Sequence, residues 1–294
     1  MVWLIGHKGM LGSEVYNVLT ANNIKFFYSD AEIDITDRKL LAATTKNEKI
    51  TWIVNCAGYT DAALAEKEKD RAANVNGYAL QNIIDIAKEK DAKIIHISTA
   101  EVFGGDVYEG YTEADTPNPL SSYAQSKLIG EQALLQNYDK HILLRTSWLY
   151  GKSGINFIHT MLKLYGAGSS VSIVDDQTSS PTYAVDVAKV IGYLIGINAD
   201  KYGIYHCSNT GQTDWFSYAK AILERSISYG VLPGWIQTKT KITPLSSSDY
   251  TSPTIIPQNS YLICNKLAKD YNITMRSWED SLDAFFTSIG KKRV

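Results

Sequence analysis

The first half of the chain alternates short, nearly continuous apolar runs with segments whose apolar residues recur at helical spacing. The runs predict strands at residues 2–6, 24–30, 52–58, 92–99 and 141–148. The segments between them predict helices near 10–22, 37–48, 72–90 and 120–137. Strands that are apolar on both faces and alternate with helices are typical of a parallel sheet covered on both sides. The sequence therefore predicts an α/β fold with a doubly wound parallel sheet.

The pattern loosens from about residue 151, where glycine, serine and threonine become frequent and prolines stand at 233, 244, 253 and 257. Helical spacing returns near 182–197, 213–228 and 277–288. We expect residues 1–150 to form the sheet domain. Residues 151–294 are expected to form a smaller part that is interleaved with the sheet.

Composition narrows the classes of function. The 294 residues are 45% hydrophobic and 20% charged, and the net charge of −2 gives no basic surface for a nucleic acid. Three cysteines stand far apart and five histidines are scattered, so we expect neither a disulfide framework nor a metal site. No signal peptide and no apolar run of ~20 residues is apparent. We expect a cytoplasmic protein without membrane or nucleic-acid partners, and its basic end, "KKRV", is expected to be solvated.

Glycines follow the first predicted strand in "LIGHKGMLG" and open the next helix. Gly6, Gly9 and Gly12 would let the backbone turn sharply and approach a pyrophosphate, which the free N–H groups of a helix start favour. The same loop carries Lys8, Met10 and Leu11. This context predicts a Rossmann dinucleotide-binding domain in residues 1–150 and a mainly substrate-binding part in 151–294. An ordinary turn between strand and helix is the alternative.

An acidic residue lies 18 positions after Gly12, at the end of the second predicted strand. Asp30 is placed to accept hydrogen bonds from the adenosine ribose, and its charge would repel a 2′-phosphate. This favours NAD over NADP as the cofactor, with NADH as the reduced form. Lys8 argues the other way because its charge would partly neutralise that phosphate, and a plain turn role for Asp30 stays open.

Tyr123 and Lys127 are four residues apart in "SSYAQSK", so they share one face of a predicted helix. A tyrosine with its usual pKa of ~10 is a poor acid at neutral pH. A neighbouring ammonium stabilises the phenolate and lowers the pKa, as general acid–base catalysis requires. The lysine is also suited to bind a nicotinamide ribose. The alternative is a surface pair on a helix.

Hydroxyl groups and a carboxylate stand where an apolar strand ends, in "HISTAEVFGG". Ligands of open parallel sheets bind beyond the carboxyl ends of the strands. Thr99 is therefore expected to face a substrate oxygen beside Tyr123, and Ser98 to lie at the cofactor. Glu101 is a candidate selector of substrate, with an ordinary loop role as the alternative.

With these elements in order, the chain resembles the extended short-chain dehydrogenase/reductases that act on nucleotide sugars. Within that class it resembles the dTDP-4-dehydrorhamnose reductases over nearly its whole length. The more specific motifs are "RTSWLYG" (145–151), "NFIHTM" (156–161), "DDQTSSPT" (175–182) and "PQNSYL" (257–262). "DIT" (34–36) and "NCAGYT" (55–60) match cofactor-side segments of the family.

The resemblance implies hydride transfer from NADH or NADPH to the C4 carbonyl of a nucleotide-linked 4-keto-6-deoxysugar. The substrate would be dTDP-4-dehydro-L-rhamnose and the product dTDP-L-rhamnose. Tyr123 would donate the proton, Lys127 would tune it and hold the ribose, and Thr99 would bond the same oxygen. Further cofactor contacts are implied at Asp34, Ile35, Cys56, Ala57, Gly58, Tyr59 and Asn76. Further substrate contacts are implied at Trp148, Asn156, Gln177 and Asn259, with core packing as an alternative for Trp148.

The chain departs from the family pattern at three places. Ala100 and Glu101 replace an Asp–Tyr pair, and Ile256 replaces an arginine. Some members share a magnesium ion between subunits through three glutamates; Glu14 and Glu279 match two, but the third position is Val185. We therefore expect no metal, and a homodimer is left open.

Because of Glu101, other functions of the same fold stay open. A glutamate two residues after the threonine is also found in nucleotide-sugar dehydratases and decarboxylases, which, like the related epimerases, hold NAD tightly. Ala100 argues against a dehydratase because it cannot protonate a leaving hydroxyl. A non-catalytic regulatory homologue is the remaining alternative, although Thr99, Tyr123 and Lys127 are retained.

Overall fold

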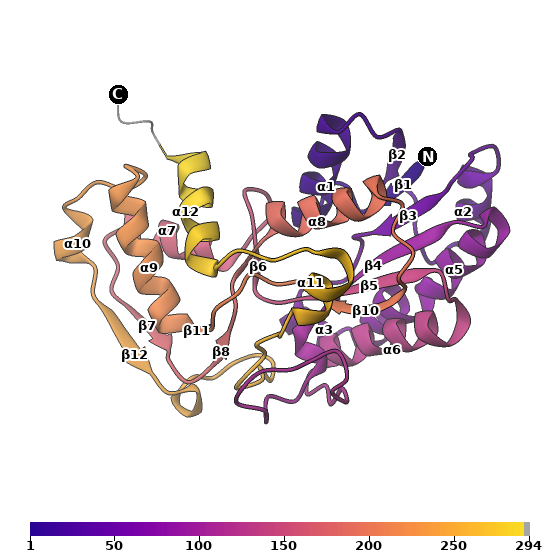
Figure 1. The fold of residues 1–294 in the computed structure, drawn as a ribbon. Coiled ribbons are helices and arrows are strands. Elements are labelled where there is room, and N and C mark those ends of the chain that lie inside the picture. The colour runs from indigo at the N-terminus through magenta and orange to yellow at the C-terminus, as the bar shows by residue number, and fades with distance from the viewer. Residues whose placement is uncertain (291–294) are drawn as a thin grey trace.

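The computed structural model describes residues 1–290, and the basic end at 291–294 lies outside the described residues. Its main sheet has six strands in the order β10-β5-β4-β3-β1-β2, all paired in parallel. The strands are β1 (Val2–Ile5), β2 (Phe26–Ser29), β3 (Trp52–Asn55), β4 (Lys93–Thr99), β5 (His141–Thr146) and β10 (Gly203–His206). The predicted α/β class with a doubly wound parallel sheet is confirmed (Figure 1).

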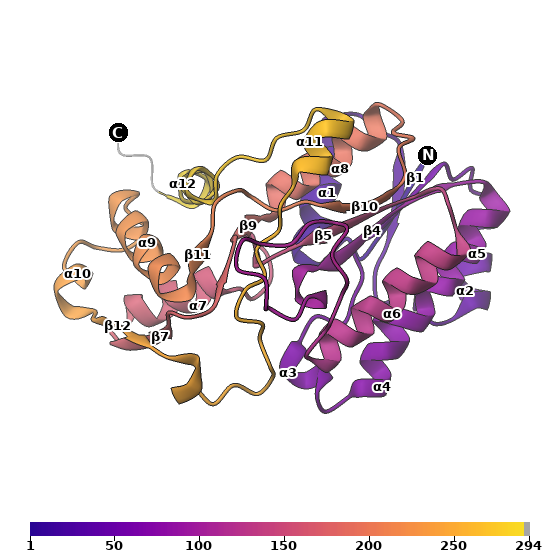
Figure 2. The same ribbon diagram turned by 60° about the horizontal axis from the view of Figure 1, so that its bottom comes forward.

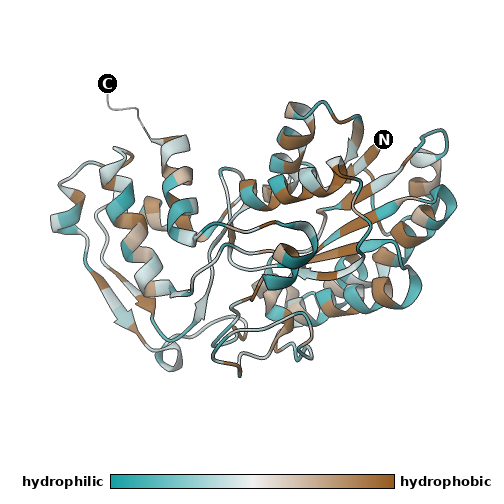
Figure 3. Ribbon diagram, viewed as in Figure 1, coloured by the Kyte–Doolittle hydropathy of each residue, from teal (hydrophilic) through white to brown (hydrophobic). Residues whose placement is uncertain are grey.

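Helices cover both faces of this sheet because successive strand residues point to opposite sides. Leu4 and Val54 pack with α1 (Met10–Ala21) and α8 (Ala184–Gly196). Ile5 and Ile53 pack on the other face, which α5 (Ala79–Lys90) and α6 (Ser122–Asn137) cover. The strands are accordingly coloured mostly as hydrophobic in Figure 3. Two apolar cores, one on each face, therefore fix the sheet.

A smaller lobe lies beside the sheet domain, where the first two figures show it as a separate group of elements (Figures 1 and 2). Its elements are α7 (Phe157–Gly166), β7 (Val171–Val174), α9 (Trp215–Ser228), α10 (Ile236–Lys239), β12 (Ile242–Leu245) and α12 (Trp278–Ile289). Stacked and edge-on aromatic rings, including those of Tyr150, Tyr183 and Phe285, fill its core. The lobe thus has an apolar core of its own.

Shorter elements connect the two lobes and the sheet helices. The helical ones are α2 (Arg38–Thr45), α3 (Ala62–Ala65), α4 (Lys69–Ala72), α11 (Asn265–Tyr271), a π-helix at Ala73–Tyr78 and 3₁₀ turns at Ala100–Val102 and Ser247–Asp249. The short strands are β6 (Leu149–Tyr150), β8 (Thr178–Ser179), β9 (Thr182–Tyr183) and β11 (Thr213–Asp214). Pairing of β6 with β9 and of β8 with β11 links segments far apart in sequence.

The strands and helices expected in the first half are present, with one long helix divided. The segment expected as a helix at 72–90 is split into the end of α4, a π-helix at 73–78 and α5. Beyond residue 150, the expected helices appear as α8, α9 and α12, whereas α7, α11 and β10 were not anticipated. Because β10 and α8 join the main sheet domain, residues from both halves build it. A domain boundary at 150 stays a prediction.

The contact between α1 and α8 is close enough to be tested with one pair of substitutions. A Cβ added at Gly192 would lie 2.4 Å from Val18 Cγ1, whereas one at Gly196 would meet nothing within 4 Å. Gly192→Ala should therefore destabilise the protein by roughly 1–3 kcal/mol through overpacking. Gly196→Ala should leave the stability unchanged or raise it by up to about 1 kcal/mol. Denaturant unfolding measures both, and equal effects of the two variants would contradict this packing.

Candidate active site

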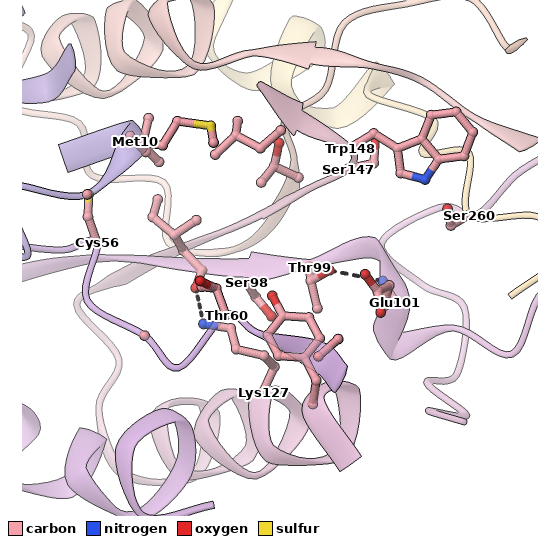
Figure 4. Close-up of a pocket in the computed structure, with 18 of the residues that line it drawn as sticks. Met10, Cys56, Thr60, Ser98, Thr99, Glu101, Lys127, Ser147, Trp148 and Ser260 are labelled. Carbon is pink, nitrogen blue, oxygen red and sulfur yellow. Dashed lines mark hydrogen bonds between the residues drawn. The ribbon is translucent and has the colours of Figure 1, made fainter. Parts of the chain in front are cut away.

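A cavity of about 460 Å³ opens at the carboxyl ends of the central strands. Figure 4 shows side chains from α6, from β4 and from the segment after β5 converging on it. The expected site residues that line it are Gly9, Met10, Leu11, Cys56, Ala57, Gly58, Ser98, Thr99, Glu101, Tyr123, Lys127 and Trp148. The structure thus brings together all three expected catalytic residues and part of the expected cofactor loop.

The glycine loop is shaped by close approach of backbone segments. Gly6 has a φ of +78°, and a Cβ there would lie 2.6 Å from the backbone nitrogen of Ala57. A Cβ on Gly12 would lie 1.9 Å from the Gly6 carbonyl oxygen. These two glycines therefore let the loop pack closely and do not line the cavity. The first turn of α1, capped by Gly9, carries no acidic side chain, so its N–H groups suit an anion.

The acid expected at the ribose is held by the glycine loop itself. The Lys8 backbone N–H donates to Asp30 Oδ2 at 2.8 Å. The Lys8 ammonium donates to Glu32 at 3.1 Å, so its charge is already paired. Neither Asp30 nor Lys8 lines the cavity. The pairing with Glu32 weakens the argument that Lys8 would neutralise a 2′-phosphate.

Two of the residues expected to bind the cofactor, Asn76 and Asp34, instead form hydrogen bonds with backbone groups of this chain. Asn76 is buried; it accepts the Tyr59 N–H at 2.7 Å and donates to the Tyr59 carbonyl at 2.9 Å and to Ser126 Oγ at 2.8 Å. Asp34 accepts the N–H of Thr36, and Ile35 lies in the core. The structure therefore gives Asn76 the role of positioning the loop after β3. Asp34, Ile35, Tyr59 and Asn76 lie outside the cavity lining.

The start of α6 is fixed by a carboxylate from another segment. Glu66 accepts hydrogen bonds from the N–H and the hydroxyl of Ser122, both at 2.7 Å. The Ser122 N–H and then its hydroxyl lower the pKa of Glu66, which stabilises the ionised form at the helix start. Ser121 caps the same helix by accepting the Ala124 N–H. Tyr123 stands in the first turn that these contacts hold.

Lys127 is buried, and its ammonium donates to the Ile97 carbonyl at 2.6 Å. Burial lowers the pKa of Lys127 to about 8, although the charge of Glu131 opposes the shift. An ammonium has three donors, and within the described residues only the Ile97 carbonyl accepts from this one. Lys127 lines the cavity, so the remaining donors fit a ligand with acceptor oxygens there.

Tyr123 and Thr99 both line the cavity. Burial and, next, the charge of Glu101 raise the pKa of Tyr123 above its ordinary value, while a hydrogen bond with Thr99 opposes the shift. Lys127 is not among the causes of the shift, so the expected lowering of this pKa by the ammonium does not appear in the structure. A raised pKa keeps the phenol protonated at neutral pH. Tyr123 is thus suited to donate a proton.

Trp148 lines the cavity in a strained backbone conformation. Its φ of +39° lies in the left-handed region, which is unusual for a bulky side chain. The indole stacks on that of Trp215, with ring centroids 3.5 Å apart and planes inclined by 15°. Both indoles belong to the cavity lining, so Trp148 contributes more than core packing.

Three expected substrate residues do not reach the cavity lining. Asn156 caps α7: it accepts the His159 N–H at 3.2 Å and donates to the Gly151 carbonyl at 2.9 Å. Asn259 donates to the carbonyls of Val107 and Tyr108. Gln177 is also buried. Asn156 and Asn259 therefore hold loops, and a substrate contact by any of the three stays a prediction.

The cavity also contains residues that sequence reasoning missed as site residues. They are Thr60, Ala62, Ile97, Thr146, Ser147, Leu149, Ile155, Trp215, Thr254 and Ser260, whereas Ile256, which also lines the cavity, is one of the departures from the family pattern. Thr146, Ser147 and Leu149 stand inside the "RTSWLYG" motif, and Ser260 inside "PQNSYL", so the motifs held a signal for them. Nothing in the local sequence indicated that Trp215 or Ile155, from distant segments, would reach the same cavity.

Neither a metal-binding cluster nor a membrane-spanning helix is found within residues 1–290. No group of three or more histidine, cysteine, aspartate or glutamate side chains in this range is arranged to hold a metal ion. Within the same range, none of the helices has the length and apolar character needed to cross a membrane.

The parallel sheet, the glycine loop and the cavity at the carboxyl ends of the strands define an extended short-chain dehydrogenase/reductase. A family model described as "RmlD substrate binding domain" matches residues 1–290. The dTDP-4-dehydrorhamnose reductase of Aggregatibacter actinomycetemcomitans is 32% identical over 286 residues, which cover 95% of this chain and 96% of that one. The chain belongs to this family of reductases.

Two other relatives extend the comparison. A crystal structure of dTDP-4-dehydrorhamnose reductase from Bacillus anthracis str. Ames in complex with NADP has a TM-score of 0.89 and 34% identity, with 98% of each chain covered. A dTDP-4-keto-6-deoxy-D-glucose reductase of Streptomyces niveus is 34% identical over 221 residues, 74% of this chain and 76% of that one. The relatives thus include reductases with different sugar names.

The contact of Glu66 with Ser122 predicts a pH-dependent contribution to stability. Because the folded protein lowers the pKa of Glu66 below 4.5, the stabilisation is present above that pH and is lost as the pH falls through the folded pKa. Glu66→Gln should cost about 1 kcal/mol or more at pH 7. The difference from the unsubstituted protein should shrink in acid. Thermal unfolding at pH 7 and in acid measures this difference in stability, and the exposed Glu224→Gln is the control. A difference that does not change with pH would contradict the prediction.

Proposed function

We propose that this protein uses NADH or NADPH to reduce the C4 carbonyl of a nucleotide-linked 4-keto-6-deoxysugar. The substrate that family membership supports best is dTDP-4-dehydro-L-rhamnose, with dTDP-L-rhamnose as the product. The observation that carries the proposal is the meeting of Thr99, Tyr123 and Lys127 on one wall of a cavity next to the glycine loop.

The cavity residues fit a nicotinamide dinucleotide. The turn at Gly9 and the N–H groups at the start of α1 would bind the pyrophosphate, and Ala57 and Gly58 line the same cavity. The two donors that Lys127 has left over in the described structure would bond the hydroxyls of the nicotinamide ribose. A bound reduced nicotinamide supplies the hydride for the reaction.

Tyr123 and Thr99 would form hydrogen bonds with the oxygen of the sugar carbonyl that is reduced. Reduction of a carbonyl develops negative charge on its oxygen, so a protonated donor must stand there. The pKa of Tyr123 is raised by its burial, which keeps the proton on the phenol until the oxygen becomes basic. Thr99 lines the same cavity and adds a second hydroxyl group that could bond the sugar oxygen. The indole of Trp148 would wall the sugar site from the small-lobe side.

The reductase activity can be tested with purified protein. Addition of dTDP-4-dehydro-L-rhamnose to the protein with NADH or NADPH should cause a loss of absorbance at 340 nm, with formation of dTDP-L-rhamnose. No loss with either cofactor would contradict the proposal. Turnover of a nucleotide sugar without added cofactor, by protein that retains bound NAD, would favour a dehydratase, decarboxylase or epimerase instead.

Removal of one hydroxyl tests the proton donor. Tyr123→Phe should lower kcat by roughly 10²-fold or more, because general acid catalysis contributes about that much. Cofactor affinity should change little. Tyr78→Phe, on an exposed side chain, is the matched control and should keep the full rate. A Tyr123→Phe enzyme with an unchanged kcat would refute the assigned role.

The preference between cofactors rests on the carboxylate at position 30. We infer that NADH is used better than NADPH, since the charge of Asp30 would repel a 2′-phosphate and Lys8 is paired with Glu32. The NADP in the Bacillus anthracis relative argues for the opposite preference. The ratio of kcat/KM for the two cofactors decides, and Asp30→Ala should move it toward NADPH. A strong NADPH preference in the unsubstituted protein would contradict the inference.

A different 4-keto-6-deoxysugar is the second candidate for the substrate. Two of the residues that depart from the family pattern, Glu101 and Ile256, lie in the cavity lining. The Streptomyces niveus relative is named for dTDP-4-keto-6-deoxy-D-glucose. Relative kcat/KM values across several 4-keto nucleotide sugars would rank the candidates. A homodimer, a cytoplasmic location and the lack of a metal requirement stay predictions.

A further inference from the structure

Glu101 is aimed into the cavity by the turn that follows β4. The 3₁₀ turn Ala100–Val102 begins where the Glu101 N–H donates to Thr99 Oγ1 at 3.2 Å (Figure 4). Ala100 and Val102, on either side, are buried in a small core with Phe103. Two of the three residues of the turn therefore anchor it, and the third places its carboxylate beside Thr99.

The carboxylate lacks a partner in the part of the chain that the structure describes. No N–H, O–H or cationic side chain of residues 1–290 bonds its oxygens. Lys127 is the one cationic residue among those that line the cavity, and its ammonium donates to Ile97. Ile256, which also lines the cavity, offers no donor. Burial raises the pKa of Glu101 to about 7 as a result.

Glu101 is half-buried and lines the cavity, so a ligand that fills the cavity would cover its carboxylate. A covered acceptor without a donor is costly, so a donor that arrives with the ligand is expected to bond it. Glu101 lines the same cavity as Tyr123 and Thr99, and its backbone N–H donates to Thr99 Oγ1, so its carboxylate lies near the oxygen that these two residues would bond. In a 4-keto-6-deoxypyranose, the reacting C4 has two ring neighbours, C3 and C5. Only C3 carries a hydroxyl, because C5 bears the ring oxygen and the methyl group.

We propose that Glu101 is a specificity-determining residue that accepts a hydrogen bond from the hydroxyl on the sugar carbon next to the reduced carbonyl. It selects nucleotide sugars with a free 3-hydroxyl and rejects those that lack it. This inference rests on the proposed function. An ionised carboxylate only accepts hydrogen bonds, so a sugar that offers no donor there leaves the charge unpaired.

The test compares two substrates in matched enzymes. The substrates are the 4-keto-6-deoxy nucleotide sugar and its 3-deoxy analogue. The enzymes are the unsubstituted protein, Glu101→Ala and Glu101→Gln, with the exposed Glu109→Gln from the same segment as control. A hydrogen bond to a charged group corresponds to roughly 10- to 100-fold in kcat/KM. The unsubstituted protein and Glu109→Gln should prefer the 3-hydroxy sugar by about that factor.

Glu101→Ala should bring this preference close to one, and Glu101→Gln should retain part of it because the amide oxygen still accepts. An unchanged preference in Glu101→Ala would overturn the inference. Equal losses on both sugars would also overturn it, since they would mean a structural or catalytic role. Failure of the unsubstituted protein to reduce the parent sugar with either cofactor would instead contradict the proposed function itself.

Discussion

The candidate site depends on one buried ammonium, which joins helix α6 to strand β4. Lys127 reaches from α6 to the carbonyl of Ile97 on β4, and the 2.6 Å contact ties the helix to the strand. A charge removed from water is tolerated only when its donors are used. Within the described residues, one N–H of the Lys127 ammonium donates to the Ile97 carbonyl. The others are available to a ligand in the cavity, which Lys127 lines. Helix, strand and ligand are therefore coupled through one side chain.

Segments distant in sequence complete the same wall. Glu66 fixes the first turn of α6 through Ser122 and so sets the place of Tyr123. Gly6 lets the glycine loop touch the loop after β3, and Gly12 lets the start of α1 pack against the glycine loop. On the opposite side, Trp148, which lies between β5 and β6, stacks on Trp215 at the start of α9. The cavity thus lies between a rigid sheet edge and a lobe with its own core, and the chemistry belongs to the sheet side.

Much of the sheet domain was predictable because its strands are apolar on both faces and its helices have one apolar side. The strand β10 and the helix α7 were not predictable from local pattern, since their place depends on tertiary packing. In the site, Thr99, Tyr123 and Lys127 were found from spacing and motifs, and the structure brings them together. Asn76 and Asn156 show the limit: their motifs marked them, but only coordinates reveal that they hold backbone. The raised pKa of Tyr123 was likewise hidden, because burial is a tertiary property.

The central claim is that the phenol, the ammonium and the threonine hydroxyl meet over a bound nicotinamide. The most direct test is a crystal structure of this protein with oxidised nicotinamide dinucleotide and the reduced nucleotide sugar. The account predicts Lys127 Nζ on the nicotinamide ribose, with Tyr123 Oη and Thr99 Oγ1 both within about 3.2 Å of the C4 oxygen. A sugar whose C4 oxygen contacts neither hydroxyl, or a dinucleotide bound away from the glycine turn, would contradict it.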